Sequence, residues 1–255
     1  MNLITKSGCA TAYGKFLLWF LRIPSREHLY RYVASGDSQS PRRTVPDQTE
    51  YRYRRLWFDF RYGTETTADR VDQTRKGWET DPDNHTYLAT RPKCVRRAFS
   101  ALPVKDLRDY TFIDFGLGKG RALLMAADLQ FKSLIGIELR KELHDKALQN
   151  FNNRRKVRSS RIESLNINAL DYEYPDGNLV LYFSNPFGEQ VLRSVLDNLG
   201  QSLASNPRDV IVVFAMFVPE FKHKADTMPF LSLEEAGHGY RVYRSRNSAR
   251  LAVAS

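Results

Sequence analysis

One segment constrains this chain more than any other, the run Asp-Phe-Gly-Leu-Gly-Lys-Gly-Arg from Asp114 to Arg121. Its three glycines let the backbone turn sharply and approach a ligand with no Cβ in the way. An apolar run precedes it, and a second apolar run, Leu134–Ile137, ends in Glu138. The pattern predicts two adjacent parallel strands that bracket a nucleoside. The helix expected over Arg121–Leu129 points its positive N-terminus into the same space. Glu138 is placed to accept hydrogen bonds from two ribose hydroxyls.

The spacing of the glycines separates two classes of nucleotide ligand. The dinucleotide-binding fingerprint has the form G-x-G-x-x-G/A. Counted from Gly116, its third small residue would fall on Arg121, which is neither glycine nor alanine. The sequence therefore disfavours an NAD-type dehydrogenase.

The pattern that does occur is acid-x-G-x-G-x-G, formed by Asp114, Gly116, Gly118 and Gly120. It resembles the first motif of class I S-adenosylmethionine (SAM) methyltransferases. The resemblance implies that SAM is the cofactor, that Asp114 holds its methionyl amine through the glycine loop, and that Glu138 binds its ribose. The alternative is a glycine turn in some other α/β domain.

Short β-rich runs alternate with helical runs, which is the pattern of a parallel sheet with helices on both faces. Strands are predicted at Thr111–Asp114, Ser133–Glu138, Ile162–Ile167, Leu179–Ser184 and Val210–Phe217, and helices at Pro92–Leu102, Arg121–Leu129, Lys141–Asn153 and Glu189–Ala204. Thr90 is predicted to cap the first helix. Phe230–Leu233 and Arg241–Arg246 predict a final hairpin. The fold class is therefore α/β: a Rossmann-like doubly wound sheet, mostly parallel with a C-terminal antiparallel hairpin. The methyltransferase resemblance implies such a sheet.

Ligands of doubly wound sheets bind outside the carboxyl ends of the strands, and the third strand end carries Asn166 to Asp171. The resemblance implies an acid or amide here that meets the adenine amine. Asn168 occupies that place, next to the small Ala169, and its amide oxygen can accept the same hydrogen bond as the more usual aspartate. Asp171 is an alternative acceptor, or the start of the turn that ends in Gly177.

The fourth strand end, Asn185-Pro186-Phe187, is expected to face the transferable methyl group. Methyl transfer needs the acceptor lone pair in line with the sulfonium carbon, so positioning contributes most. We assign Asn185 to orient an N–H or O–H acceptor, Pro186 to stiffen the loop and Phe187 to form an aromatic wall. The alternative is a tight turn in which Asn185 caps the backbone. The loop is similar to the N/D-P-P-Y/F/W motif of amino-group DNA and RNA methyltransferases, with one proline too few.

Two further resemblances extend beyond the single motifs, and the first 50 residues lie outside them. Dot1-like protein lysine methyltransferases share the aspartate–glycine loop, the strand-end glutamate and a loop with Asn and Phe. Bacterial class I methyltransferases of undefined substrate share Phe58–Thr64, then Tyr87-x-x-Thr90, the glycine loop and Asn-Pro-Phe, in this order over residues 57–246. The Dot1-like resemblance implies that Tyr87 and Thr90 cover the methionine end of SAM as a lid. Leu117 stands where a small or polar residue is usual, which predicts a narrower cofactor pocket.

Composition bounds the broad class. A chain of 255 residues is long enough for one large α/β domain with an extension. Its two cysteines and five scattered histidines form no disulfide framework or metal motif. The apolar run Phe16–Leu21 is too short to span a bilayer, and without an export signal we expect a cytoplasmic location. Domains are predicted at 1–50 (basic extension and linker), 51–110 (arm and lid helices) and 111–255 (SAM-binding methyltransferase domain).

The net charge is +10, and residues 1–76 hold 14 Lys/Arg against 8 Asp/Glu. This bias favours an anionic partner for the first third of the chain. Tyr51–Tyr62 interleaves aromatics with arginines, which suits single-stranded nucleic acid but suits better an arm whose aromatics pack on the core. We predict SAM-dependent methyl transfer to an N or O acceptor, with a protein amine favoured over nucleic acid or a small molecule. The alternative is a non-catalytic nucleic-acid or surface-binding module on the same scaffold.

Overall fold

The computed structural model describes residues 58–67, 87, 89–154, 162–215 and 225–246. All of them belong to one compact unit, Arg55–Ser255. The predictions for residues 1–50, for 51–57 and for the end of the fifth strand at 216–217 lie outside the described residues. The predicted domain boundaries stay predictions.

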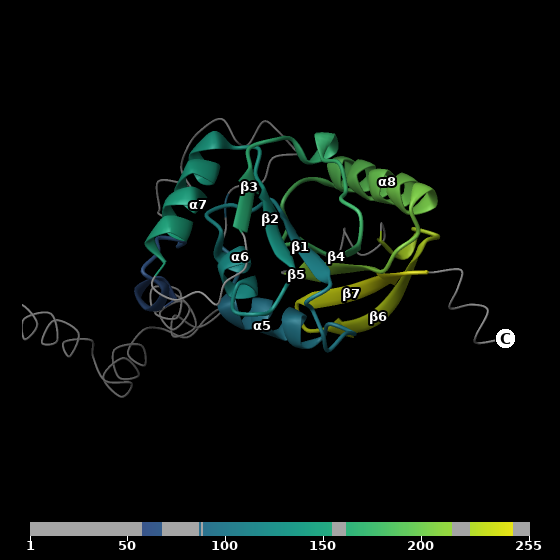
Figure 1. Cartoon of the computed structure of the whole chain (residues 1–255), viewed down its shortest axis with the longest axis horizontal. Helices are drawn as coiled ribbons and strands as arrows, with labels where there is room; N and C mark the ends of the chain where they lie inside the picture. Colours follow the sequence, from purple (N-terminus) through teal and green to yellow (C-terminus); the bar gives the residue numbers. More distant parts are fainter. Residues whose placement is uncertain (1–57, 68–86, 88, 155–161, 216–224, 247–255) are drawn as a thin grey trace, which may run out of the picture. The chain divides into compact units, whose positions relative to one another are not determined.

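Seven strands form a single sheet in the order β3-β2-β1-β4-β5-β7-β6 (Figure 1). The strands are β1 (Tyr110–Phe115), β2 (Ser133–Ile137), β3 (Ile162–Leu165), β4 (Asn178–Phe183), β5 (Val210–Ala215), β6 (Leu231–Gly237) and β7 (Tyr240–Ser245). The first five run parallel, and β7 pairs antiparallel with both β5 and β6. The predicted α/β class, with its parallel sheet and final antiparallel hairpin, is confirmed.

The helices predicted before and between the parallel strands are confirmed in position to within a few residues. They are α5 (Pro92–Ser100), α6 (Arg121–Ala126), α7 (Lys141–Asn153) and α8 (Glu189–Ser205), with a short 3₁₀ helix, η1 (Ala169–Asp171). The predicted N-cap of α5 is wrong. Arg91 occupies that position and offers no side-chain cap, since arginine carries no acceptor. The hydroxyl of Thr90 is hydrogen-bonded to Ser184.

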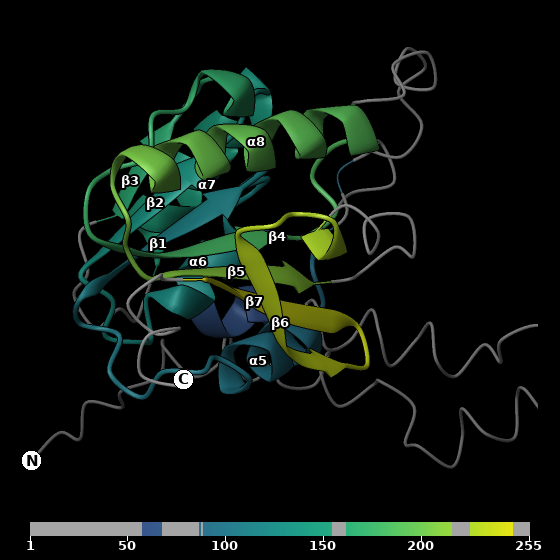
Figure 2. The same cartoon turned by 90° about the vertical axis from the view of Figure 1, so that its right-hand side faces the viewer.

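The core lies on both faces of the sheet, since successive strand side chains point to opposite sides. On one face, Phe112 and Tyr182 pack against residues of α5, α6 and α7. On the other, Ile113 and Leu181 pack under the apolar side of α8. Figure 2 shows α8 on one side of the sheet and α5 on the other. Coverage of both faces explains why β5 is buried along its whole length.

The final hairpin is longer than the sequence predicts. The predicted loop of residues 234–240 is wrong in extent, because β6 continues to Gly237 and only residues 238–239 turn. Pairing continues past the two acidic residues through an irregularity in register between Leu233 and Glu235. At Gly237 a Cβ would lie 2.4 Å from Cε1 of Tyr240. The glycine therefore gives the tyrosine ring room to lie against the end of β6.

Two features are absent from the described residues. None of the helices in this part of the chain combines the length and apolar character that a membrane span requires. No group of three His, Cys, Asp or Glu side chains suited to a metal ion occurs among the same residues.

Candidate cofactor and acceptor site

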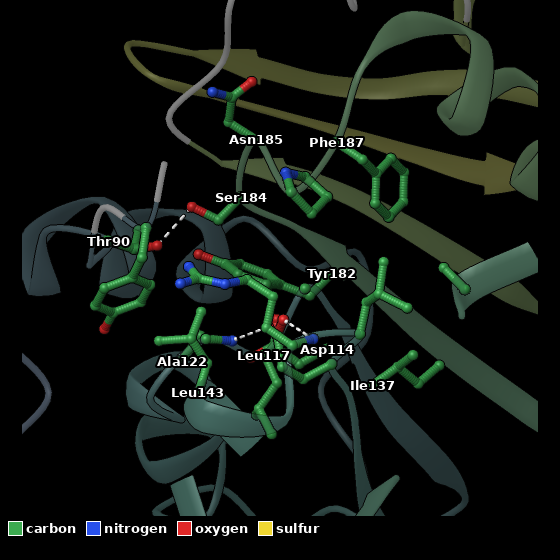
Figure 3. A pocket seen from close by; sticks show the side chains of 18 of the residues that line it. Thr90, Asp114, Leu117, Ala122, Ile137, Leu143, Tyr182, Ser184, Asn185 and Phe187 are labelled. Atoms are coloured by element: carbon green, nitrogen blue, oxygen red, sulfur yellow. Dashed lines mark hydrogen bonds between the residues drawn. The ribbon is translucent and has the colours of Figure 1, made fainter. Parts of the chain in front are cut away.

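A cavity of about 350 Å³ opens at the carboxyl ends of the parallel strands (Figure 3), where doubly wound sheets bind their ligands. Its volume lies within the usual range for small-molecule sites. Every predicted site residue except Gly120 lines it. These are Tyr87, Thr90, Asp114, Gly116, Gly118, Glu138, Asn168, Ala169, Asn185, Pro186 and Phe187. The sequence motifs, which are far apart in the chain, are thus brought together around one space.

The first two glycines of the loop let other residues reach the cavity wall. Gly116 and Gly118 have positive φ values of 74° and 56°, a region that side chains with a Cβ disfavour. A Cβ on Gly118 would lie 2.4 Å from Cε2 of Tyr87, and one on Gly116 would lie 2.3 Å from Cβ of Pro186. The glycine loop therefore contacts both Tyr87, the predicted lid residue, and Pro186 in the predicted acceptor loop, Asn185 to Phe187.

The third glycine lies beside α7 rather than at the cavity wall. Gly120 is not among the residues that line the cavity. It precedes α6 with φ 87°, and a Cβ there would lie 2.6 Å from the ring of Phe151 on α7. Gly120 thus serves the packing of α7 against the loop. Its assignment as a cofactor-binding residue stays a prediction.

Two buried carboxyl groups, Asp114 and Glu138, lie at the cavity. Each oxygen of Glu138 accepts a backbone N–H, one from Gly118 (2.8 Å) and one from Arg140 (2.9 Å). Oδ2 of Asp114 is buried and has no hydrogen-bond partner among the described residues. Burial, and then the charge of Glu138, raise the pKa of Asp114 well above its usual range. Burial also raises the pKa of Glu138, opposed by its two backbone donors.

Leu117 lines the cavity, and the narrower cofactor pocket predicted from its size stays a prediction. Its side chain is 4 % exposed and lies over Gly136 of β2, where a Cβ would come within 2.6 Å of its Cδ1. The glycine on the neighbouring strand therefore provides the space that Leu117 needs. The two residues form a complementary pair, and the cavity beside them remains open.

The predicted adenine-binding residues lie at the end of β3. Oδ1 of Asn168 accepts a hydrogen bond from the N–H of Leu170 (3.0 Å) and so caps η1. Because an amide oxygen has two lone pairs, one remains for a ligand. Asp171 does not line the cavity, so the structure does not support it as the alternative acceptor.

The acceptor loop is held in an uncommon conformation. Asn185 has φ 53°, the single positive value among the described non-glycine residues, and its buried Oδ1 has no hydrogen-bond partner among those residues. Phe187 is nearly buried and packs edge-on against Phe183. Beside the loop, Ser184 is hydrogen-bonded to Thr90 at 2.5 Å, and the two residues lie next to each other in Figure 3.

The sequence did not predict a polar cluster that holds residues 59–67 together. The carboxylate of Asp59 accepts hydrogen bonds from Thr64, Thr66 and Thr67, using both backbone and side-chain donors at 2.6–3.0 Å. The available signal was an aspartate followed by several threonines, which tend to form local side-chain-to-backbone hydrogen bonds. We call these four residues the Asp59 bracket.

Arg121 connects the Asp59 bracket to the glycine loop. Its buried guanidinium donates to Thr66 (2.7 Å), Thr67 (3.0 Å) and the carbonyl of Thr90 (3.3 Å). It also lies 3.6 Å from the Asp59 carboxylate and 5.0 Å from the centre of the Phe58 ring. Arg121, which departs from the dinucleotide fingerprint, thus holds residues 58–67 against the glycine loop.

The aromatic arm agrees in part with its prediction. Phe58 is 3 % exposed and stacks on Tyr62 with ring centroids 4.4 Å apart, as expected of an arm that packs on the core. Phe60 points outward and is 55 % exposed. Residues 51–57 of the arm lie outside the described part of the chain.

The hydroxyl of Tyr87 donates to the carbonyl of Thr66 at 2.6 Å, so the Asp59 bracket positions this side of the cavity. We expect Tyr87→Phe to weaken SAM binding about fivefold, because one hydrogen bond contributes roughly 1 kcal/mol. Tyr174→Phe is the matched control, since its hydroxyl donates to the carbonyl of Val195 (3.0 Å) away from the cavity. Calorimetry on both variants tests the prediction. Equal SAM affinities for the two would contradict it.

Comparison with known proteins leaves the family open. No protein-family model and no curated protein matches this sequence. Solved structures that resemble it include a ribosomal protein L11 methylase from Lactobacillus delbrueckii subsp. bulgaricus (17% identity, 61% of this chain and 78% of that one, TM-score 0.43) and a putative methyltransferase from Escherichia coli (19%, 62% and 89%, 0.44). A third is magnesium protoporphyrin IX methyltransferase from Synechocystis with bound SAM (11%, 61% and 77%, 0.43). Likeness at this level does not specify a reaction or a substrate.

Proposed function

We propose that this protein is a SAM-dependent methyltransferase that acts on a nitrogen or oxygen acceptor. The observation that carries the proposal is the buried Oδ2 of Asp114, which has no partner among the described residues and lies in a cavity walled by glycine backbone. A buried polar atom without a partner costs free energy. The cost is offset when a ligand brings a cation or donor to that atom, and the methionyl amine of SAM is such a group.

The other residues of the cavity fit the remaining parts of SAM. Glu138, at the end of β2, has a lone pair left on each oxygen for the ribose hydroxyls. Asn168 and Ala169 offer an amide oxygen and a small side chain to adenine. The two buried acids, Asp114 and Glu138, also favour a ligand with positive charge. Tyr87 and Thr90 close the side of the cavity nearest the Asp59 bracket.

When bound, SAM supplies an electrophilic methyl group that passes to a nucleophile in line with the breaking carbon–sulfur bond. The role of the chain is to orient the two reactants and exclude water. Asn185 presents an amide oxygen that can hold an acceptor N–H or O–H, so that the acceptor lone pair points inward. Pro186 packs on the glycine loop and Phe187 on the core, which keeps Asn185 in place. The protein amine stays a prediction, as does the likeness to Dot1-like enzymes.

Asn185→Gly tests the acceptor role. Glycine tolerates a φ of 53° without strain, so we expect SAM affinity to be unchanged and methyl transfer to fall at least about tenfold, the effect of one lost orienting hydrogen bond. The measurement is transfer of labelled methyl groups to protein, RNA and small-molecule fractions. Wild-type protein that binds SAM and labels none of them would instead support the non-catalytic alternative.

A further inference from the structure

A second hollow, an open groove of about 530 Å³, lies between α5 and the β6–β7 hairpin. Lys93, Arg96 and Arg97 line it from the helix, and Glu235, His238 and Tyr240 line it from the hairpin. The two elements lie side by side in Figure 2. We call this feature the α5–hairpin groove. It shares none of its residues with the cofactor cavity.

The α5–hairpin groove is strongly cationic. Lys93, Arg96 and Arg97 stand at positions i, i+3 and i+4, which share one face of a helix, and all three are exposed. No ion pair joins them to any acid in the part of the chain that the structure describes. The one acid lining the groove, Glu235, accepts a hydrogen bond from the Tyr240 hydroxyl (2.6 Å).

The groove lies at the same edge of the sheet as the proposed methyl-transfer site. β5 runs parallel to β4, with Phe214 beside Phe183, and it ends at Ala215. Tyr240 pairs with Ala215, so the turn at residues 238–239 protrudes from the edge where the acceptor loop begins. At the other side, α5 begins directly after Thr90 and Arg91, and Thr90 is bonded to Ser184 beside that loop.

We infer that the α5–hairpin groove binds the phosphate backbone of a polynucleotide. The polynucleotide is the methyl acceptor, and the groove guides it to Asn185. Arginine guanidinium groups pair with phosphate oxygens through two parallel hydrogen bonds. His238 and the half-exposed Tyr240 add flat rings on which bases can stack, which favours a polynucleotide over a peptide that carries only carboxylates. The groove is distinct from the basic first third in which the sequence placed an anionic partner. Its identification as the acceptor track rests on the proposed function and favours nucleic acid over the protein amine predicted from the sequence.

The test uses the full chain and a fluorescein-labelled single-stranded RNA of about 20 nucleotides, longer than the roughly 4–16 nucleotides of a single-strand site. We expect Arg96→Ala/Arg97→Ala to weaken RNA binding at least about tenfold. The slope of log affinity against log salt concentration should also fall by the equivalent of about one to two phosphate contacts. Lys105→Ala/Lys132→Ala is the matched control. It removes the same charge from exposed residues that precede β1 and β2 at the opposite edge. This control should change RNA affinity little.

SAM titration of the same variants separates the two proposals. Neither pair lines the cofactor cavity, so SAM affinity should be unchanged in both. Equal RNA affinity for the two double variants would overturn the assignment of the groove, as would wild-type protein that binds SAM but not RNA. A poly-glutamate peptide that binds as tightly as RNA would point to an acidic protein partner and also overturn it. RNA binding lost only in the Arg96/Arg97 variant, with no SAM binding, would uphold the groove and refute the proposed enzyme.

Discussion

Gly118→Val is expected to abolish measurable SAM binding. The residue has φ 56°, where a side chain with a Cβ costs about 1–2 kcal/mol and a β-branched one fits least well. Its Cβ would also lie 2.4 Å from the ring of Tyr87. The ring or the loop must therefore move, and both form the wall of the cavity. Calorimetric titration with SAM measures the loss.

Gly177→Val separates backbone strain from this contact. Gly177 also has a positive φ, 91°, but no atom lies within 4 Å of a Cβ built there, and it does not line the cavity. We expect this variant to lose about 1–2 kcal/mol of unfolding free energy and to bind SAM like the wild type. If Gly118→Val kept its SAM affinity, the assignment of the glycine loop to the cofactor would be wrong.

Asp114→Asn is expected to lower SAM affinity by about two orders of magnitude and to make the free protein more stable near neutral pH. The first effect follows because removing one partner of a buried charge pair costs roughly 2–5 kcal/mol. The second follows from the raised pKa of Asp114. The amide has the same shape as the carboxyl group and carries no charge to be buried without a partner.

The sign of the pH effect distinguishes a cofactor-binding role of Asp114 from a structural one. The folded protein keeps the Asp114 proton at pH values where the unfolded chain has already released it. The stability of the free protein should therefore fall as pH rises from about 4, the unfolded pKa, toward the raised folded pKa. Asp114→Asn should lessen this fall, as measured by denaturant unfolding across pH. A variant that is less stable than wild type at neutral pH would indicate that Asp114 holds the fold.

The parts of this molecule that can be predicted from the sequence are those that local patterns determine. Strands and helices are recoverable because buried parallel strands are short apolar runs between amphipathic helices, as at Leu179–Phe183 before α8. Most of the cavity follows as well, since the carboxyl ends of parallel strands meet at one edge of the sheet. Asp114 and Glu138 are placed together by topology alone.

The features that the sequence did not predict depend on contacts between distant residues. In the sequence, Arg121 is only a departure from a glycine pattern. Its partners Asp59 and Thr66 belong to a segment over fifty positions earlier. The fit of Leu117 requires Gly136 on the next strand. Gly120 matched the motif, but the side chain it accommodates belongs to α7. No local periodicity reports such pairings.

The central claim is that the cavity beside Asp114 binds SAM. Calorimetric titration of the purified full chain with SAM and with its demethylated product, S-adenosylhomocysteine, tests this most directly. We expect micromolar binding of both, at one site, with SAM affinity much reduced in Asp114→Asn and absent in Gly118→Val. Absence of binding by either compound to the folded wild-type protein would contradict the claim and leave a methyltransferase-like scaffold without its cofactor.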